Sequence, residues 1–196
     1  MIIIVATITL TTVVDANAIS GENKRKIKEL SDVPRYIKRF ANVGDMPTER
    51  DLNYIGRKYD LPDGLLYAMF WKETHYKCNV KSSANAYGCF QFQYWSAKEV
   101  NLIGKIGKRD YDYRTNPWIA ADAAARYLKI IQYKLNLANS KDPHSIALML
   151  AGYNAGIGKI RRDGNKLNPP MYTETQYYIE DILGYVEGNR HIGQRG

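Results

Sequence analysis

The chain has 196 residues, a length that favours one domain with a single sizeable core. Its apolar content of 45% and charged content of 24% are ordinary for a folded soluble protein, which argues against a disordered chain. The formal net charge of +8 indicates an anionic partner, and charge alone does not choose among nucleic acid, a membrane surface and acidic cell-envelope polymers. The 16 tyrosines suit carbohydrate binding or reflect a compositional bias.

The N-terminus is apolar. Residues 1–14 are almost entirely apolar or Thr and carry no charge, and Ala16-Asn17-Ala18 follows with small residues where a signal peptidase cuts. This pattern predicts a secretory signal peptide over residues 1–18 and therefore a secreted or periplasmic protein. No Lys or Arg precedes the apolar run, so a buried N-terminal strand is the alternative. Residues 19–46 are predicted to form a tether followed by a helix.

Two helices are predicted between residues 47 and 74. Thr48 followed by Asp51 is typical of a helix start, and this helix is expected to run to about Tyr59. Pro62 opens the next helix, whose apolar stripe consists of Leu65, Leu66, Met69 and Phe70. Glu73 falls on the same stripe in the last turn, where a carboxyl group is least expected.

The second half of the chain is also mostly helical by pattern. Residues 78–86 are irregular, and residues 86–94 are extended or form a tight turn. A long helix is predicted from Pro117 to about residue 135, and Asp142 caps another that breaks at Gly156. Asn154 is placed on the buried stripe of that helix. A last helix is expected over residues 175–187, so the fold class is mainly α with a short irregular or β insertion after the Glu73 helix.

The position of Glu73 has a chemical consequence. A carboxyl group on an apolar stripe is poorly solvated, and desolvation raises its pKa because the charged form is disfavoured. A carboxyl group that keeps its proton near neutral pH is suited to act as a general acid, which cleavage of a glycosidic bond requires. From periodicity alone, a helix-end Glu that reaches solvent is the alternative.

Four motifs occur in order along the chain. Glu73-Thr74 comes first, then Gly88-Cys-Phe-Gln91, then Ala151-Gly-Tyr-Asn-Ala-Gly156, and last Glu174-Thr-Gln-Tyr-Tyr-Ile179. The ordered set resembles the catalytic domain of the soluble lytic transglycosylases, relatives of goose-type lysozyme, over about residues 61–185. The resemblance implies a lysozyme-like single domain, which we place at residues 47–190 with a tail at 191–196.

The resemblance also implies roles for particular residues. Glu73 matches the family's single catalytic carboxylate, which acts first as an acid and then as a base. The residues that match substrate-binding positions are Thr74, Phe90, Gln91, Tyr153, Asn154 and Tyr178. No metal or cofactor is implied.

Two cysteines depart from the family pattern. Cys78 and Cys89 stand where the family often has Pro and usually has Leu, on either side of the loop that follows Glu73. By composition alone they form a disulfide in an exported protein or are two free buried thiols. Because both positions deviate together, we infer a disulfide that holds this loop beside the catalytic helix.

The expected activity is cleavage of the β-1,4 bond between N-acetylmuramic acid and N-acetylglucosamine in peptidoglycan, which leaves 1,6-anhydromuramyl ends. The first alternative is hydrolysis, as in goose-type lysozyme, for which Asp110 and Asp112 are candidates for the second carboxylate. The second alternative is a wall-binding module without catalysis. We expect a monomer that binds glycan strands and not nucleic acid, and the sequence leaves open a secretion, conjugation or phage assembly as a partner.

Overall fold

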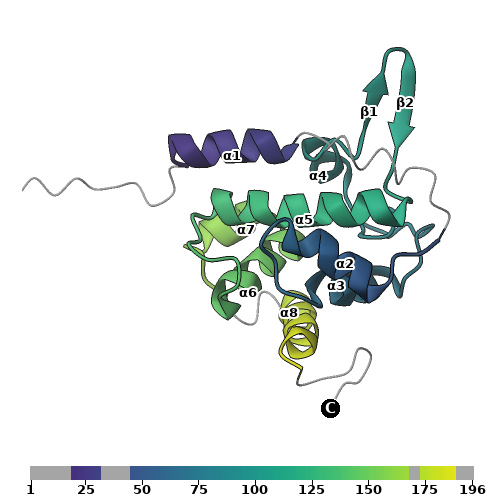
Figure 1. Cartoon of the computed structure of the whole chain (residues 1–196). Coiled ribbons are helices and arrows are strands. Elements are labelled where there is room, and N and C mark those ends of the chain that lie inside the picture. Colours follow the sequence, from purple (N-terminus) through teal and green to yellow (C-terminus); the bar gives the residue numbers. More distant parts are fainter. Residues whose placement is uncertain (1–18, 32–44, 168–172, 189–196) are drawn as a thin grey trace, which may run out of the picture.

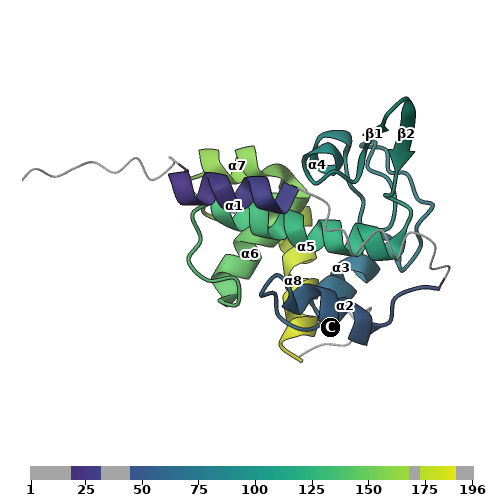
Figure 2. The same cartoon turned by 45° about the horizontal axis from the view of Figure 1, so that its top comes forward.

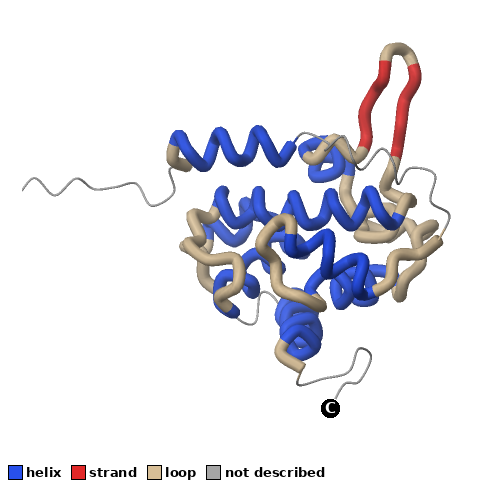
Figure 3. Tube along the Cα trace, viewed as in Figure 1, coloured by secondary structure: helices blue, strands red, loops and turns tan. Residues whose placement is uncertain are grey.

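The computed structural model describes residues 19–31, 45–167 and 173–188, and this part of the chain is mainly helical (Figure 3). The helices are α1 (Gly21–Ser31), α2 (Glu49–Arg57), α3 (Leu65–Thr74), α4 (Tyr94–Glu99), α5 (Pro117–Lys134), α6 (Pro143–Ala151), α7 (Ile157–Arg162) and α8 (Thr173–Val186). The strands are β1 (Ile103–Ile106) and β2 (Arg109–Asp112). The predicted signal peptide, the helix expected near residues 30–40 beyond Ser31, and the tail lie outside the described residues.

Helix α5 forms the centre of the domain. In both orientations it runs through the middle of the helices, with α1 along one side and α2 and α3 on another (Figures 1 and 2). Its many alanines remove side-chain bulk on every face, and Ala120, Ala121, Ala123, Ala124 and Ala125 are all fully buried. Neighbouring helices therefore approach its backbone closely, as ridge-into-groove packing of helices requires.

A buried ion pair inside α5 connects separate parts of the fold. Asp122 and Arg126 lie one turn apart, both side chains are 1% exposed, and their closest N–O distance is 2.7 Å. The hydroxyl of Tyr59 donates to Asp122 at 2.6 Å, and Arg126 donates to the Val100 carbonyl at 2.7 Å. Because a buried charge is tolerated only when it is paired and hydrogen-bonded, this network fixes the segments after α2 and α4 against α5.

The helix starts predicted at Thr48 and Asp142 are present, whereas the helix predicted to open at Pro62 begins instead at Leu65, after Gly64. Thr48 accepts from the backbone N–H of Asp51, and Asp51 accepts from that of Thr48, which is a complete capping box. Asp142 accepts from the N–H of Ser145 at 2.8 Å at the start of α6. Residues 21–28, which fall within the segment predicted to be a tether followed by a helix, belong to α1, which packs on α5.

Strands β1 and β2 form an antiparallel hairpin that projects beyond the helices (Figure 1). Ile103 pairs with Asp112 and Ile106 with Arg109, and Gly107 makes the turn with φ 63°. The sequence predicted a β or irregular insertion, and the structure adds that its regular part is this hairpin. Within the described ranges, no helix is both long and apolar enough to cross a membrane.

The predicted break at Gly156 takes an unexpected form. Residues Gly152–Gly156 form one turn of π-helix between α6 and α7, and Gly156 has φ 92°. A π turn inserts an extra residue and changes which face each following side chain occupies. For this reason Asn154, predicted to lie on the buried stripe, is exposed.

Candidate active site

A cleft of about 810 Å³ lies beside the end of α3. Side chains from α3, α4, the π turn and α8 reach it, together with the loop between α3 and α4. Its lining is mostly polar and aromatic: Lys72, Glu73, Ser82, Ser83, Ala84, Ala86, Gln91, Phe92, Gln93, Trp95, Ser96, Tyr127, Tyr153, Asn154, Ala155, Gly156, Glu174, Tyr177 and Tyr178. The cleft therefore brings together five residues singled out from the sequence, namely Glu73, Gln91, Tyr153, Asn154 and Tyr178.

Glu73 reaches the cleft because α3 stops one residue later. His75 and Tyr76 both adopt left-handed backbone conformations, with φ 52° and 61°, and the His75 N–H closes the helix on the Trp71 carbonyl at 2.7 Å. The chain then turns away, and Glu73 remains in the last turn of a helix whose buried residues are mostly apolar.

The carboxyl group of Glu73 is poorly hydrated. Burial raises its pKa from 4.5 to about 7, against the opposing effects of the Tyr178 hydrogen bond and of the Lys72 charge. The hydroxyl of Tyr178 donates to Oε1 of Glu73 at 2.7 Å, and the Tyr178 side chain is only 4% exposed. Lys72 also lines the cleft and pairs with Asp181 of α8. The raised pKa expected from the position of Glu73 in the sequence is thus present, and a substantial fraction of the carboxyl group keeps its proton near neutral pH.

The side chain of Gln91 is held by hydrogen bonds to backbone carbonyl groups near it. Its φ is 46°, and its side-chain amide donates to the carbonyls of Val80 at 3.0 Å and Gly88 at 2.9 Å. Gly88 has φ 86°, and a Cβ there would lie 2.1 Å from the carbonyl oxygen of Arg114. Only glycine fits at position 88, so this residue serves backbone geometry.

Tyr153 and Asn154 approach the cleft from the π turn. The Tyr153 hydroxyl donates to the Phe90 carbonyl at 2.7 Å, and its ring contacts those of Phe92 and Tyr127 edge-on. Asn154 accepts a hydrogen bond from the Thr175 hydroxyl at 2.6 Å. The π turn is therefore tied to both the loop after α3 and α8.

Thr74 and Phe90 are placed differently from the other predicted residues. Thr74 is buried and donates to the carbonyl of Cys89 at 3.0 Å, and Phe90 is fully buried and stacks on Phe70 with ring centroids 5.0 Å apart. Neither residue is among those that line the cleft. Their contacts support the site from behind instead of forming its wall, and Phe92 is the phenylalanine that reaches the cleft.

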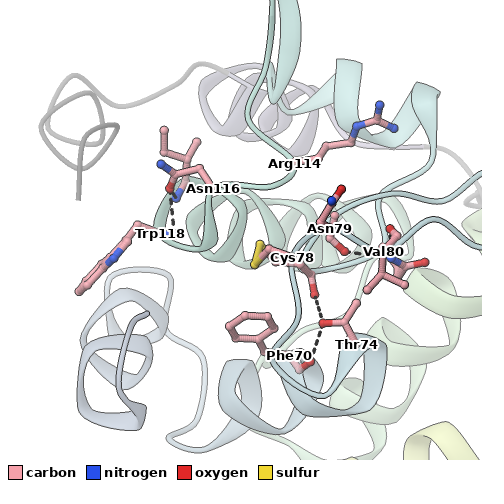
Figure 4. The surroundings of a disulfide bond; sticks show 12 residues. Phe70, Thr74, Cys78, Asn79, Val80, Arg114, Asn116 and Trp118 are labelled. Carbon is pink, nitrogen blue, oxygen red and sulfur yellow. Dashed lines mark hydrogen bonds between the residues drawn. A yellow bond between two sulfur atoms is a disulfide. The ribbon is translucent and has the colours of Figure 1, made fainter. Parts of the chain in front are cut away.

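The Cys78–Cys89 disulfide is formed (Figure 4). Figure 4 shows Thr74 and Phe70 beside Cys78, at the point where the loop after α3 returns to the helix. The disulfide closes the loop between Cys78 and Cys89, and the carbonyl of Cys89 also accepts the hydrogen bond from Thr74. The predicted attachment of this loop to the helix that bears Glu73 is confirmed.

The two aspartates considered for a hydrolytic site lie elsewhere. Asp110 and Asp112 belong to β2, where they pair with Lys105 at 3.6 Å and with Arg114 at 2.7 Å. Neither lines the cleft, so their candidacy as the second carboxylate is wrong. Among the described residues, Glu174 is the other carboxylate on the cleft lining, and the sequence reasoning gave it no role.

Further residues of the cleft were missed by the sequence reasoning. Trp95 and Tyr177 line it while remaining 75% and 53% exposed, and Tyr127 lines it from α5. An exposed aromatic side chain does not belong to the apolar stripe of its helix, so hydrophobic periodicity in the sequence does not single it out as a cleft residue. In the described part of the chain, no group of three or more His, Cys, Asp or Glu side chains is arranged to hold a metal ion.

The mainly helical architecture with a small sheet insertion is the lysozyme-like fold expected from the sequence. The profile of the transglycosylase SLT domain matches residues 52–170, more than half of the sequence, and the chain belongs to this family. The matched region includes Glu73, Gln91 and Asn154 and ends before Tyr178.

A curated relative adds one further comparison. The membrane-bound lytic murein transglycosylase F of Saccharophagus degradans is 26% identical over 155 residues, which are 71% of this chain and 29% of that protein. The chain thus spans less than a third of the length of this relative. The similarity concerns a domain and not the whole of the longer protein.

Proposed function

We propose that this protein is a peptidoglycan lytic transglycosylase in which Glu73 is the single acid and base. The observation that carries the proposal is the partly buried Glu73 side chain, whose carboxyl group has its pKa raised to about 7 by desolvation, in a cleft lined by aromatic and amide side chains. The family match and the name of the curated relative support the same reaction class.

In the first step, the protonated Glu73 gives its proton to the oxygen between N-acetylmuramic acid and N-acetylglucosamine. The bond from that oxygen to the anomeric carbon of the muramyl residue breaks, and the N-acetylglucosamine portion leaves with a new hydroxyl group. The 2-acetamido group of the substrate stabilises the developing cation, so one carboxyl group suffices, as in other substrate-assisted glycosidases. The Tyr178 hydroxyl, which already donates to Oε1, favours the carboxylate that this step leaves behind.

In the second step, the Glu73 carboxylate takes the proton of the muramyl 6-hydroxyl. That oxygen attacks the anomeric carbon and closes a 1,6-anhydro ring, and Glu73 regains its proton without consuming water. A pKa near neutrality suits both steps, because the group must give and accept a proton at the same pH.

The amide side chains are assigned complementary binding roles. The Gln91 amide nitrogen is engaged by two backbone carbonyls, so its oxygen is the group offered to sugar hydroxyl or acetamido N–H donors. The Asn154 oxygen accepts from Thr175, so its amide nitrogen is the group offered to sugar oxygens. Tyr153 forms part of the wall, and Thr74 and Phe90 hold the backbone behind it.

Hydrolysis is the alternative reaction. Glu174, which also lines the cleft, is the candidate for the second carboxylate that it requires. In that reaction a second carboxylate positions water, as in inverting glycosidases. Glu174→Gln would then abolish cleavage as fully as Glu73→Gln, whereas the proposed mechanism needs only Glu73.

The proposal places the enzyme outside the cytoplasm, where the apolar residues 1–14 would direct it and where the disulfide is stable. Its substrate there is the glycan strand of the cell wall. A secretion, conjugation or phage assembly remains the proposed setting for a partner complex.

The test is release of soluble fragments from purified peptidoglycan by the wild type, Glu73→Gln and a matched control. Glu180→Gln makes the same chemical change on the exposed side of α8 and should retain full activity. Loss of a general acid costs at least about 100-fold in rate, so Glu73→Gln should be nearly inactive. Undiminished release by Glu73→Gln would remove the assignment of Glu73 as the general acid, whereas absence of release by the wild type would favour a role in wall binding alone.

A further inference from the structure

Two large aromatic side chains stand exposed on the lining of the cleft. Trp95 is 75% exposed and Tyr177 is 53% exposed. Trp95 belongs to α4 and Tyr177 to α8, and these helices lie on opposite sides of α5 in both orientations (Figures 1 and 2). Both residues line the same cleft as Glu73, so a ligand bound there lies beside both aromatic rings and the carboxyl group.

Leaving a large aromatic ring in contact with water costs free energy, and packing within the protein does not offset this cost at Trp95 and Tyr177. Most large aromatic side chains bury much of their surface, and Phe70, Phe90 and Phe92 in this protein are at most 2% exposed. A tryptophan left three-quarters exposed on a cleft is typical of a ligand-binding surface.

Trp95 is also restrained. Its ring meets that of Tyr94 edge-on, with centroids 5.0 Å apart, and the Lys98 ammonium lies 5.7 Å from the Trp95 ring centroid. These contacts limit the rotamers of Trp95 while leaving most of its surface uncovered. A restrained ring loses little conformational freedom on binding, which favours affinity.

We infer that Trp95 and Tyr177 are stacking platforms for two sugar residues of one glycan strand bound in the cleft that contains Glu73. The inference rests on the proposed function and adds specificity-determining residues to it. The apolar face of a pyranose ring covers an exposed aromatic ring, while its hydroxyl groups stay available to Gln91 and Asn154. A strand that contacts both platforms is held in one register within the cleft, so the pair influences which glycosidic bond Glu73 reaches.

The platforms predict a particular kinetic pattern. Stacking acts on bound substrate and transition state alike, so Trp95→Ala and Tyr177→Ala should raise KM and leave kcat nearly unchanged. Each should weaken binding by about tenfold, the usual effect of removing one central aromatic contact. Trp95→Phe and Tyr177→Phe keep a ring and should bind within about threefold of the parent.

The experiment measures co-sedimentation with purified, insoluble peptidoglycan in a Glu73→Gln background, so that cleavage does not consume the ligand. Tyr54→Ala is the control, because Tyr54 is 63% exposed on α2 and does not line the cleft. Circular dichroism of each variant verifies the fold, which an exposed position should not disturb. KM and kcat are then measured for the same substitutions in the wild-type background.

The outcomes separate this inference from the proposed function. Tenfold weaker binding of both alanine variants, with Tyr54→Ala and both phenylalanine variants near the parent, supports the platforms. If the wild type degrades peptidoglycan but the alanine variants bind it as the parent does, the platforms are refuted and the enzyme assignment stands. If the wild type neither degrades nor binds peptidoglycan, both proposals fall.

Discussion

Replacement of Glu73 by Gln should stabilise the protein at neutral and alkaline pH. The carboxyl group has a pKa of about 7 in the folded chain because burial disfavours its charge, against an ordinary value of 4.5. Between these values the folded state holds a proton that the unfolded state has released. The favourable contribution of the neutral carboxyl group is therefore complete below about pH 4.5 and is lost as the pH rises through about 7.

The size of the effect follows from the two pKa values. Their difference corresponds to about 3 kcal/mol of destabilisation of the wild type above pH 7, since each pH unit between them contributes about 1.4 kcal/mol. Gln carries no charge at any pH, and its oxygen can still accept the hydrogen bond from Tyr178. The variant should thus resemble the wild type in stability near pH 4 and exceed it by up to about 3 kcal/mol near pH 8.

Urea unfolding of both proteins from about pH 4 to about pH 8 measures this difference directly. Glu180→Gln, at an exposed position on α8, provides the control and should give a difference that stays within about 0.5 kcal/mol at every pH. A Glu73→Gln difference that does not grow with pH would refute the view that Glu73 is desolvated.

Three further changes test other parts of the site. Tyr178→Phe removes the hydrogen bond that lowers the Glu73 pKa, so the alkaline limb of the kcat/KM profile should move to higher pH, and a downward shift would contradict the assigned contact. Gly88→Ala should lower the free energy of unfolding by more than about 2 kcal/mol in thermal unfolding, because its Cβ meets the Arg114 carbonyl. Gly107→Ala, also at positive φ but in open space, should lower it by about 1 kcal/mol, and equal losses in the two variants would exclude the clash. Reduction of the Cys78–Cys89 disulfide, which spans 11 residues, should lower the free energy of unfolding by about 3 kcal/mol. Denaturant titrations with and without reductant measure this loss, and unchanged curves would count against the role of the disulfide in holding the loop.

The features that the sequence predicted well are those set by near neighbours. The starts of α2 and α6 depend on one side chain and an N–H three residues later, so Thr48 and Asp142 could be recognised directly. The place of Glu73 on α3 depends on regular helical periodicity, which α3 follows up to Thr74. The family motifs then supplied residues that lie far apart in the sequence and close together at the cleft.

Other features depend on contacts that no local pattern encodes. Asn154 was misplaced because a π turn interrupts the helical period at Gly152–Gly156. The hairpin was not located because both sides of β2 are largely exposed, which removes the alternation of apolar and polar residues. Trp95 and Tyr177 both line the cleft but belong to helices separated by more than seventy residues.

The central claim is that one carboxyl group cleaves the glycan strand without water. Mass analysis of the fragments released from purified peptidoglycan tests it most directly, because an anhydro end is lighter than a reducing end by one water. The account predicts anhydromuramyl ends from the wild type and almost no fragments from Glu73→Gln. Reducing ends from the wild type, together with loss of activity in Glu174→Gln, would contradict it and identify a hydrolase.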